Sequence, residues 1–334
     1  MSSESTHEPA RTSSEPIPDD AIGHNFVDRG DLSTEQANEA SADLDTLETE
    51  EAVALFARED AVAVKAVELA QASLVRTVDI VANALAAGGR LIYVGAGTSG
   101  RLGMLDAIEC PPTFRSKPEQ VQALLAGGSD AMQRSVEGAE DEANDAGKRA
   151  AALRLTKQDV VLGITAGGTT PFVHGALREA RRAGAHSILL ACVDVHEYPD
   201  PAYIDFSIRL NTGPEIIAGS TRLKAGTATK LALNTISSLA MVRLGKVHGN
   251  LMVDVNTRAN AKLTDRGERL VMRIANAPRE RAHDLLETAD GEVKTAIVMA
   301  MSSLDAEEAR AQLQIHVGRL RETLTSLRDD QPTR

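Results

Sequence analysis

The 334 residues allow one large α/β domain with an appendage, or two modest domains, because compact domains usually run to roughly 100–200 residues. Hydrophobic residues make up 43% and charged residues 25% of the chain, which excludes a wholly disordered protein. Only 2% of the residues are aromatic and none is Trp, which argues against sites that stack bases or sugars on aromatic rings. The net charge of -12 disfavours nucleic acid and anionic membranes as partners.

The N-terminal segment and the cysteines indicate where the protein works. Residues 1–40 hold nine acidic residues against two basic ones, and Ser, Pro and Glu dominate the first 30, so we expect a disordered acidic tail over 1–30. Cys110 and Cys192 lack CxxC or CxxH spacing, which indicates neither a disulfide framework nor a zinc site. No apolar run reaches the roughly 18 residues of a membrane span. We therefore expect a cytoplasmic protein.

The predicted elements follow an order that indicates the fold class. Helical spacing of apolar residues over 47–87, ended by two glycines, predicts two helices. Short apolar runs then alternate with helical stretches, which is typical of an α/β fold with a doubly wound parallel sheet flanked by helices. The predicted strands are 90–94, 121–125, 159–164, 187–193 and 204–210, and the predicted helices between them are 102–109, 141–153 and 172–183.

The last third of the chain reads as helical. A long Ala- and Leu-rich helix is predicted over about 224–244, and short amphipathic helices over 264–327 are separated at Pro278, Gly291 and Ser302-Ser303. We therefore expect a sheet domain over 31–255, with its N-terminal helices, followed by a small all-helical domain over 256–334.

The first glycine-rich loop directly follows the predicted strand 90–94. It reads GAGTSGR over 95–101 and opens a helix, a GxGxxG pattern shared with dinucleotide sites. A dinucleotide site also needs an acidic residue after the second strand, where this chain has Ala126 and Gly127. The backbone and hydroxyls at this helix N-terminus favour a phosphate monoester instead, and a purely structural turn stays open as an alternative. The residues expected to bind it are Gly97, Thr98, Ser99 and Gly100.

A second loop of the same character follows the predicted strand 159–164. Gly167, Gly168, Thr169 and Thr170 precede Pro171, which suits the first turn of a helix. Loops at the carboxyl ends of parallel strands converge on one crevice in a doubly wound sheet. We therefore predict that both loops bind one small phosphorylated ligand.

Further candidates stand outside the two loops. Glu109 precedes Pro111 and Pro112, which we expect to end its helix, in a setting that its neighbours should make half-buried. A carboxylate at a helix C-terminus is electrostatically disfavoured, so a functional role is favoured for Glu109. Glu140 lies in an acidic run, for which a solvated helix start is the simpler interpretation. Ser220, Thr221 and Lys224 precede the long helix, where contact with an anion is favoured over a structural cap, while Glu215 is a candidate sugar contact or a surface residue.

Five blocks of sequence, in order, resemble one family. They read GAGTSGRLG at 95–103, DAIECPPTF at 106–114, VEGAED at 136–141, GSTRLKAGT at 219–227 and GNLMVDV at 249–255. The blocks resemble the N-acetylmuramic acid 6-phosphate etherase family, a member of the sugar isomerase (SIS) superfamily of phosphosugar-binding folds. The resemblance runs from about Asp31 to near the C-terminus.

The resemblance implies a reaction and its two acidic residues. It implies cleavage of the D-lactyl ether at carbon 3 of N-acetylmuramic acid 6-phosphate during peptidoglycan recycling, giving N-acetylglucosamine 6-phosphate and D-lactate without a metal or organic cofactor. One glutamate would protonate the departing lactate and a second would act near carbon 2 and the incoming water. By motif match these residues are Glu109 and Glu140. The second loop departs from the common pattern Ala-Ser-Gly-Arg-Thr-Pro, because Gly167 and Thr169 replace its serine and arginine.

Two other functions stay open on the sequence. An aldose-ketose phosphosugar isomerase would share the proton abstraction but would release no lactate, and a non-catalytic phosphosugar-sensing regulator would share only the fold. The presence of both Glu109 and Glu140 argues against the regulator. The predicted helix 224–244 and the helices before Gly88 carry more apolar surface than one sheet covers, which predicts a homodimer, with active sites that a neighbouring subunit could complete.

Overall fold

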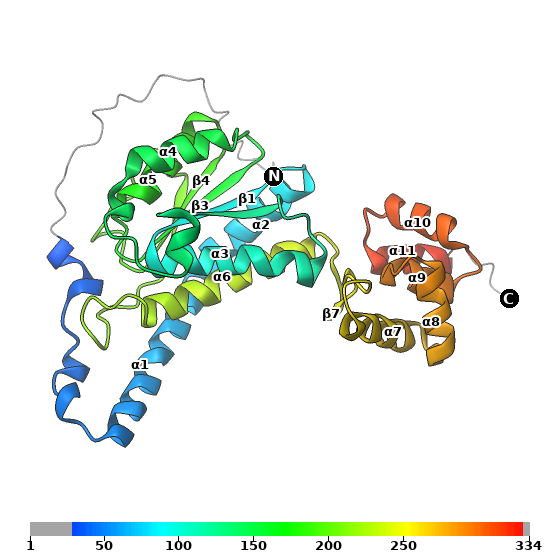
Figure 1. Cartoon of the computed structure of the whole chain (residues 1–334), viewed down its shortest axis with the longest axis horizontal. Helices are drawn as coiled ribbons and strands as arrows, with labels where there is room; N and C mark the ends of the chain where they lie inside the picture. Colours follow the sequence, from blue (N-terminus) through cyan, green and yellow to red (C-terminus); the bar gives the residue numbers. More distant parts are fainter. Residues whose placement is uncertain (1–28, 330–334) are drawn as a thin grey trace, which may run out of the picture.

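The computed structural model describes residues 29–329, and its centre is one parallel sheet (Figure 1). Five strands form this sheet in the order β2-β1-β3-β4-β5, and each neighbouring pair is parallel. The strands are β1 Leu91–Gly95, β2 Val121–Leu125, β3 Val160–Thr165, β4 His186–Ala191 and β5 Phe206–Arg209. All five predicted strands are confirmed, with small shifts at their ends, because strands buried on both faces read as apolar runs.

Helices cover both faces of the sheet. On one face α2, α3 and α6 pack with Leu91 and Tyr93 of β1, and on the other α4 and α5 pack with Ile92 and Val94. Successive side chains of a strand point to opposite faces, so β1 is apolar along its whole length. The helices are α2 Gln71–Ala86, α3 Gly97–Phe114, α4 Ala143–Ala152, α5 Pro171–Arg182 and α6 Lys224–Arg243. The predicted doubly wound α/β fold is therefore confirmed.

An N-terminal arm precedes the sheet. Four short 3₁₀ helices lead into α1 (Thr49–Leu69), which projects away from the sheet in Figure 1, and α2 returns the chain to it. The 3₁₀ helices are Arg29–Asp31, Ser33–Glu35, Glu39–Ser41 and Leu44–Thr46. The predicted disordered tail over 1–30 lies outside the described residues, except for Arg29 and Gly30.

The C-terminal helices form a separate body with their own core, at the far end of the view in Figure 1. A short hairpin of β6 (Val247–His248) and β7 (Leu251–Met252) connects it to the sheet. The helices are α7 Ala261–Ala275, α8 Arg279–Thr288, α9 Val293–Met301, α10 Ala306–Ile315 and α11 Leu320–Asp329. Its core includes Val253 and Val255, just before the expected boundary. Within residues 29–329, no helix is both long enough and apolar enough to cross a membrane.

The predicted end of the helix at Glu109 is wrong, because α3 continues to Phe114 with Pro111 and Pro112 inside its last turn. A proline there removes N–H donors but leaves its own carbonyl available, and Arg115 N donates to Pro111 O at 2.9 Å. The helix stops at Phe114 because the next residue, Arg115, has a left-handed backbone with φ 50°.

Two facing glycines set the spacing of α4 and α5. A methyl group added at Gly175 would lie 2.0 Å from the carbonyl oxygen of Ala143, a backbone atom that cannot yield. A methyl group added at Gly147 would lie 3.7 Å from Gly175 O, which is ordinary van der Waals contact. The two helices therefore touch closely at Gly175 and have space at Gly147.

We expect Gly175→Ala to lower the free energy of unfolding by about 3 kcal/mol, because α4 must move away from α5. Gly147→Ala should instead leave it unchanged or raise it by up to about 1 kcal/mol, since alanine favours the helix. Urea unfolding followed by circular dichroism measures both effects. Similar effects of the two substitutions would contradict the close contact at Gly175.

Candidate functional site

The two glycine-rich loops lie at the same edge of the sheet. β1 and β3 are hydrogen-bonded neighbours, with Gly95 opposite Ile164 in the register, and each strand ends where its loop begins. The first loop leads directly into α3 and the second into α5, whose first residue is Pro171 as predicted. The structure therefore brings together the loop residues that the sequence singled out.

The first loop presents the N-terminus of α3. The helix begins at Gly97, so the amides of Gly97, Thr98 and Ser99 have no acceptor within the helix and lie at the positive end of its dipole. Gly100 N donates to Ala96 O at 3.1 Å, and a methyl group at Gly100 would lie 2.4 Å from Gly95 O. Only glycine lets the helix start this close to β1. The arrangement suits an anion such as a phosphate.

The second loop is fixed by its own hydroxyls and by the N-terminal arm. Thr165 and Thr170 share a hydrogen bond of 2.7 Å between their hydroxyls, and Gly168 has a left-handed backbone with φ +82°. A side chain at Gly167 would meet the Cδ1 atom of buried Leu32 at 3.0 Å. The arm packed against the loop therefore gives a steric reason for glycine at 167, where the common pattern has serine.

His174 is hydrogen-bonded to the second loop and holds it in place, a role that the sequence did not predict. Its Nε2 lies 2.6 Å from Gly168 O and its Nδ1 lies 3.0 Å from the hydroxyl of Tyr203. Because a carbonyl only accepts, Nε2 carries the proton and Nδ1 accepts from Tyr203. Burial lowers the pKa of His174 to about 4, although the bond to Gly168 opposes that shift. The buried ring is therefore neutral near pH 7 and holds the loop in place.

Acid should weaken the fold through His174. Its pKa is lower in the folded chain than in the unfolded chain, so the stability that the neutral ring contributes is present above about pH 6.5 and is lost toward pH 4. Between pH 7 and pH 4, the free energy of unfolding of the wild type should fall by about 3 kcal/mol more than that of His174→Gln.

Urea unfolding at pH 7, 5.5 and 4 measures this difference. Gln at position 174 keeps a donor for Gly168 without an imidazole. Replacing His196, whose side chain is exposed, by Gln is the matched control and should follow the wild type. The assignment is wrong if His174→Gln shows the same acid dependence as the wild type.

The segment before α6 lies beside the first loop. A methyl group added at Gly226, in the first turn of α6, would lie 3.4 Å from the side chain of Thr98 and 3.6 Å from Thr221 O. Ser220 and Thr221 are half-buried here. The segment that carries the predicted anion-binding residues therefore borders the first loop at Thr98.

Two charged residues of the same segment are held inside the protein. Glu215 is buried, and its carboxylate accepts 2.9 Å hydrogen bonds from the backbone N–H groups of Lys224 and Ala225, which caps α6. The Lys224 ammonium donates to Glu59 of α1 at 2.6 Å and is also buried. Lys224 lowers the pKa of Glu59 through this bond, while burial opposes it. The structure assigns both residues contacts that position α6, and their contact with a ligand stays a prediction.

The two candidate catalytic glutamates are exposed. Glu109 lies on α3 beside Ile108, which is 57% exposed, so the expected half-buried setting is wrong for the single chain. The residue after Glu109, Cys110, is buried. Glu140 is exposed in the 3₁₀ helix Ala139–Asp141, which follows β2.

A buried carboxylate fixes the orientation of α3. Asp106 accepts a 2.8 Å hydrogen bond from the Tyr93 hydroxyl of β1 and a 3.1 Å hydrogen bond from the Ser237 hydroxyl of α6. Burial raises the pKa of Asp106, and the two hydroxyl donors oppose that shift. These bonds join sheet, α3 and α6 at one point, one helical turn before Glu109.

Comparisons with known proteins identify the family. N-acetylmuramic acid 6-phosphate etherase of Synechocystis sp. is 53% identical over 297 residues, which are 89% of this chain and 96% of that protein. This chain belongs to the N-acetylmuramic acid 6-phosphate etherase family. The etherase of Crocosphaera subtropica is 50% identical over 300 residues, covering 90% of this chain and 97% of that protein. The resemblance drawn from the sequence blocks is thus confirmed.

Two further comparisons match part of the chain. The family model for the glucokinase regulatory protein N-terminal SIS domain matches residues 73–181, which span β1 to α5. The solved structure of phosphoheptose isomerase from Neisseria gonorrhoeae is 17% identical, with a TM-score of 0.40 over 58% of this chain and 97% of that chain.

Proposed function

We propose that this protein cleaves the D-lactyl ether at carbon 3 of N-acetylmuramic acid 6-phosphate. The products are N-acetylglucosamine 6-phosphate and D-lactate, as recycling of cell-wall amino sugars requires. The observation that carries the proposal is the meeting of two glycine and hydroxyl loops at one sheet edge in a chain of this family. These loops suit the 6-phosphate, which the amides of Gly97, Thr98 and Ser99 would bind.

The reaction needs an acid and a base rather than a nucleophile of the protein. In the open-chain sugar, a base removes the proton at carbon 2 while an acid protonates the lactyl oxygen, and the bond from carbon 3 to oxygen breaks. Water then adds at carbon 3 and a proton returns to carbon 2. We propose Glu109 as the acid toward lactate and Glu140 as the group at carbon 2 and the water, as the family motifs imply.

Lactate release in deuterated water tests this reaction. We expect wild-type protein to release lactate and to place deuterium at carbon 2 of the product. Glu109→Gln and Glu140→Gln should each lower the rate at least about a hundredfold, the size typical of a lost general acid or base. Enzymatic lactate assay and mass spectrometry of the sugar measure both outcomes.

Glu137→Gln is the matched control, because Glu137 is also exposed and lies three residues before Glu140. It should retain the wild-type rate. Isomerisation of the sugar phosphate without lactate would favour the isomerase, and binding without any conversion would favour the regulator.

The length of α3 supports an active site shared between two subunits. Glu109 follows Gly97 by 12 residues, or about 18 Å along the helix. That length exceeds the distance from the phosphorus to carbon 3 in a hexose 6-phosphate. A substrate bound at the first loop would therefore meet Glu109 of a second subunit.

Exposed apolar side chains support the same homodimer. α3 exposes Leu105 and Ile108 beside Glu109, and α6, which is bonded to α3 through Ser237 and Asp106, exposes Leu239 and Val242. Large exposed apolar side chains on two adjoining helices are typical of a subunit interface. We propose that a second copy of this chain covers α3 and α6.

Mixing two inactive variants tests the shared site. Glu109→Gln lacks the proposed acid, and a Thr98→Val/Ser99→Ala variant lacks the loop hydroxyls. After the two variants are unfolded and refolded together, mixed dimers should contain one intact site each, and activity should return to about a quarter of the wild-type value. Each variant refolded alone is the control. No recovery, although mixed dimers form, would place the loop and Glu109 of one site in the same subunit.

We also propose that the protein works in the cytoplasm. We propose 31–255 as the catalytic domain, since both loops and both glutamates lie within it.

A further inference from the structure

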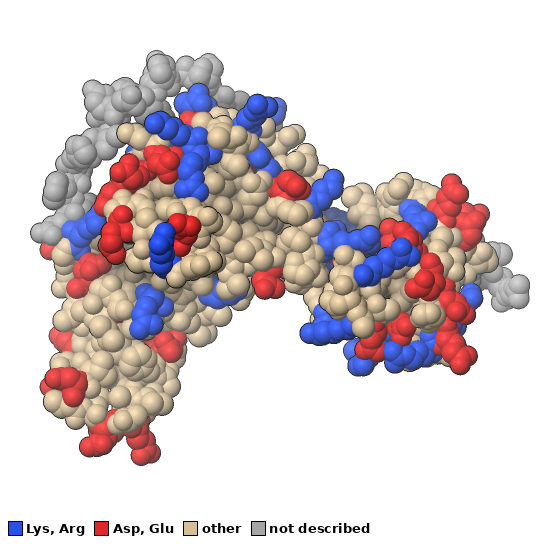
Figure 2. Space-filling model, in the orientation of Figure 1, with Lys and Arg blue, Asp and Glu red and all other residues tan. Residues whose placement is uncertain are grey.

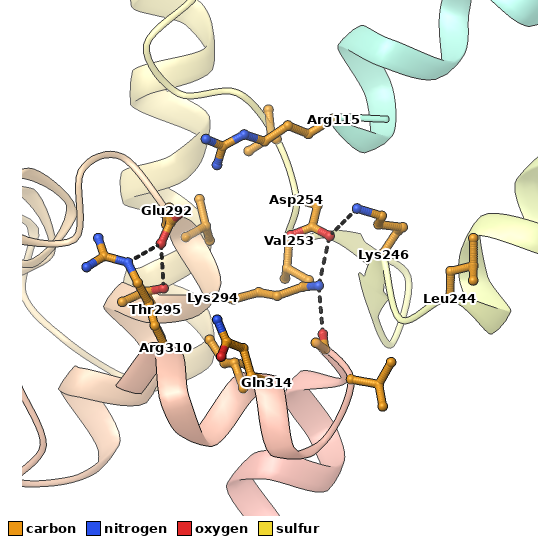
Figure 3. Close-up of a pocket in the computed structure, with 15 residues that line it drawn as sticks. Arg115, Leu244, Lys246, Val253, Asp254, Glu292, Lys294, Thr295, Arg310 and Gln314 are labelled. Atoms are coloured by element: carbon orange, nitrogen blue, oxygen red, sulfur yellow. Dashed lines mark hydrogen bonds and ion pairs between the residues drawn. The ribbon is translucent and has the colours of Figure 1, made fainter. Parts of the chain in front are cut away.

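A cavity lies between the sheet domain and the C-terminal helices, away from the glycine-rich loops. Its volume is about 330 Å³, which is within the range of small-ligand sites. The end of α3, the segment from the end of α6 to Val255, and the helices α9 and α10 all contribute to its wall (Figure 3). Any molecule bound there would contact both parts of the chain.

Two lysines in this wall share one carboxylate oxygen. Lys246 and Lys294 donate to the same Oδ2 atom of Asp254, at 3.0 and 2.8 Å, and Lys294 also donates to Gly318 O at 2.7 Å. One carboxylate cannot neutralise two ammonium groups, so the group as a whole stays positive. Burial lowers the pKa of Lys294 and Lys246 lowers it further, while Asp254 opposes both effects. The lysines therefore lie where a second anion would be favourable.

Two arginines add to this charge. The Arg115 side chain extends toward the cavity from the end of α3, and no hydrogen bond between its guanidinium and an acid is found among the described residues (Figure 3). Although burial opposes the shift, the charge of Arg115 acts on Glu292 across the cavity and helps to lower the pKa of that carboxyl. Arg310 donates to Glu292 at 2.8 Å, and Thr295 donates to the same carboxylate at 3.0 Å. Both acids of the wall, Asp254 and Glu292, thus already have cationic partners.

The wall therefore has a surplus of two positive charges among its described residues. Four cations, Arg115, Lys246, Lys294 and Arg310, face two anions, Asp254 and Glu292. Figure 2 shows the same trend on the visible surface, where basic side chains gather on the side of the C-terminal helices that faces the sheet. A phosphate monoester carries close to two negative charges at neutral pH and accepts hydrogen bonds on three oxygens.

We propose that this junction cavity is a second anion site, which binds the phosphate group of a small phosphorylated metabolite. Arg115 and Lys246 contact the phosphate, and the remaining volume holds the organic part of the molecule. The bound metabolite joins the C-terminal helices to the end of α3, and α3 carries Glu109 six residues before Arg115. The site is separate from the two loops and does not depend on the reaction proposed for them.

The test uses inorganic phosphate as the probe and the full chain as the sample. Amide signals in the ¹⁵N TROSY spectrum are followed as phosphate replaces chloride at constant ionic strength. Signals of Gly318 and Thr295 should shift with saturation and report the cavity, whereas those of Thr98 and Ser99 report the loops. Two sets of signals separate the failure of this site from the failure of the proposed active site.

Three variants decide the outcome. The Arg115→Ala/Lys246→Gln variant should bind phosphate at the cavity about tenfold more weakly or worse, and should leave the loop signals unchanged. Arg115→Lys, which keeps a cation, should retain most of the affinity. Arg281→Ala removes an exposed arginine of α8 outside the cavity and should behave as the wild type. Unsaturable shifts at Gly318, or equal affinity in the double variant and the wild type, would overturn the proposal.

Discussion

The pairing of β1 with β3 is the constraint on which the candidate site depends. Because these strands are parallel neighbours, their carboxyl ends lie at one edge, and two loops far apart in the chain must meet there. Other contacts then refine the edge. Gly100 allows α3 to start close to β1, and His174 holds the second loop through its hydrogen bond to Gly168. Glu215 caps α6, whose first turn lies beside Thr98.

Much of this arrangement could be predicted from the sequence, for two physical reasons. Strands covered on both faces are apolar at every position, so β1 and β3 stand out as short runs. Glycines and hydroxyls at the start of a helix indicate an anion site, and this inference does not depend on contacts with distant residues. The predicted end of α3 was wrong because proline removes an N–H donor without forbidding a helical backbone, so α3 continues through Pro111 and Pro112 with two fewer donors.

The remaining features depend on residues distant in sequence. Nothing in the sequence distinguishes His174 from the other histidines, of which the chain has eight in all. Only the fold brings Gly168 and Tyr203 to its two ring nitrogens. Lys224 beside hydroxyls suggested an anion contact, but Glu59 lies across from it in the folded chain. The positive cavity is assembled from three stretches, 115, 244–255 and 292–318, which no local pattern relates. Sequence periodicity predicts elements well and predicts charge pairs between them poorly.

The two prolines of α3 have a chemical consequence beyond its length. A helical carbonyl normally receives the N–H of the residue four positions later, and for Ala107 and Ile108 those residues are Pro111 and Pro112. Both carbonyl oxygens, in the two residues just before Glu109, therefore lose that donor. The Ile108 side chain is exposed, so this stretch of α3 lies at the surface. The carboxyl-terminal part of α3 is therefore held by fewer backbone hydrogen bonds than an unbroken helix of the same length.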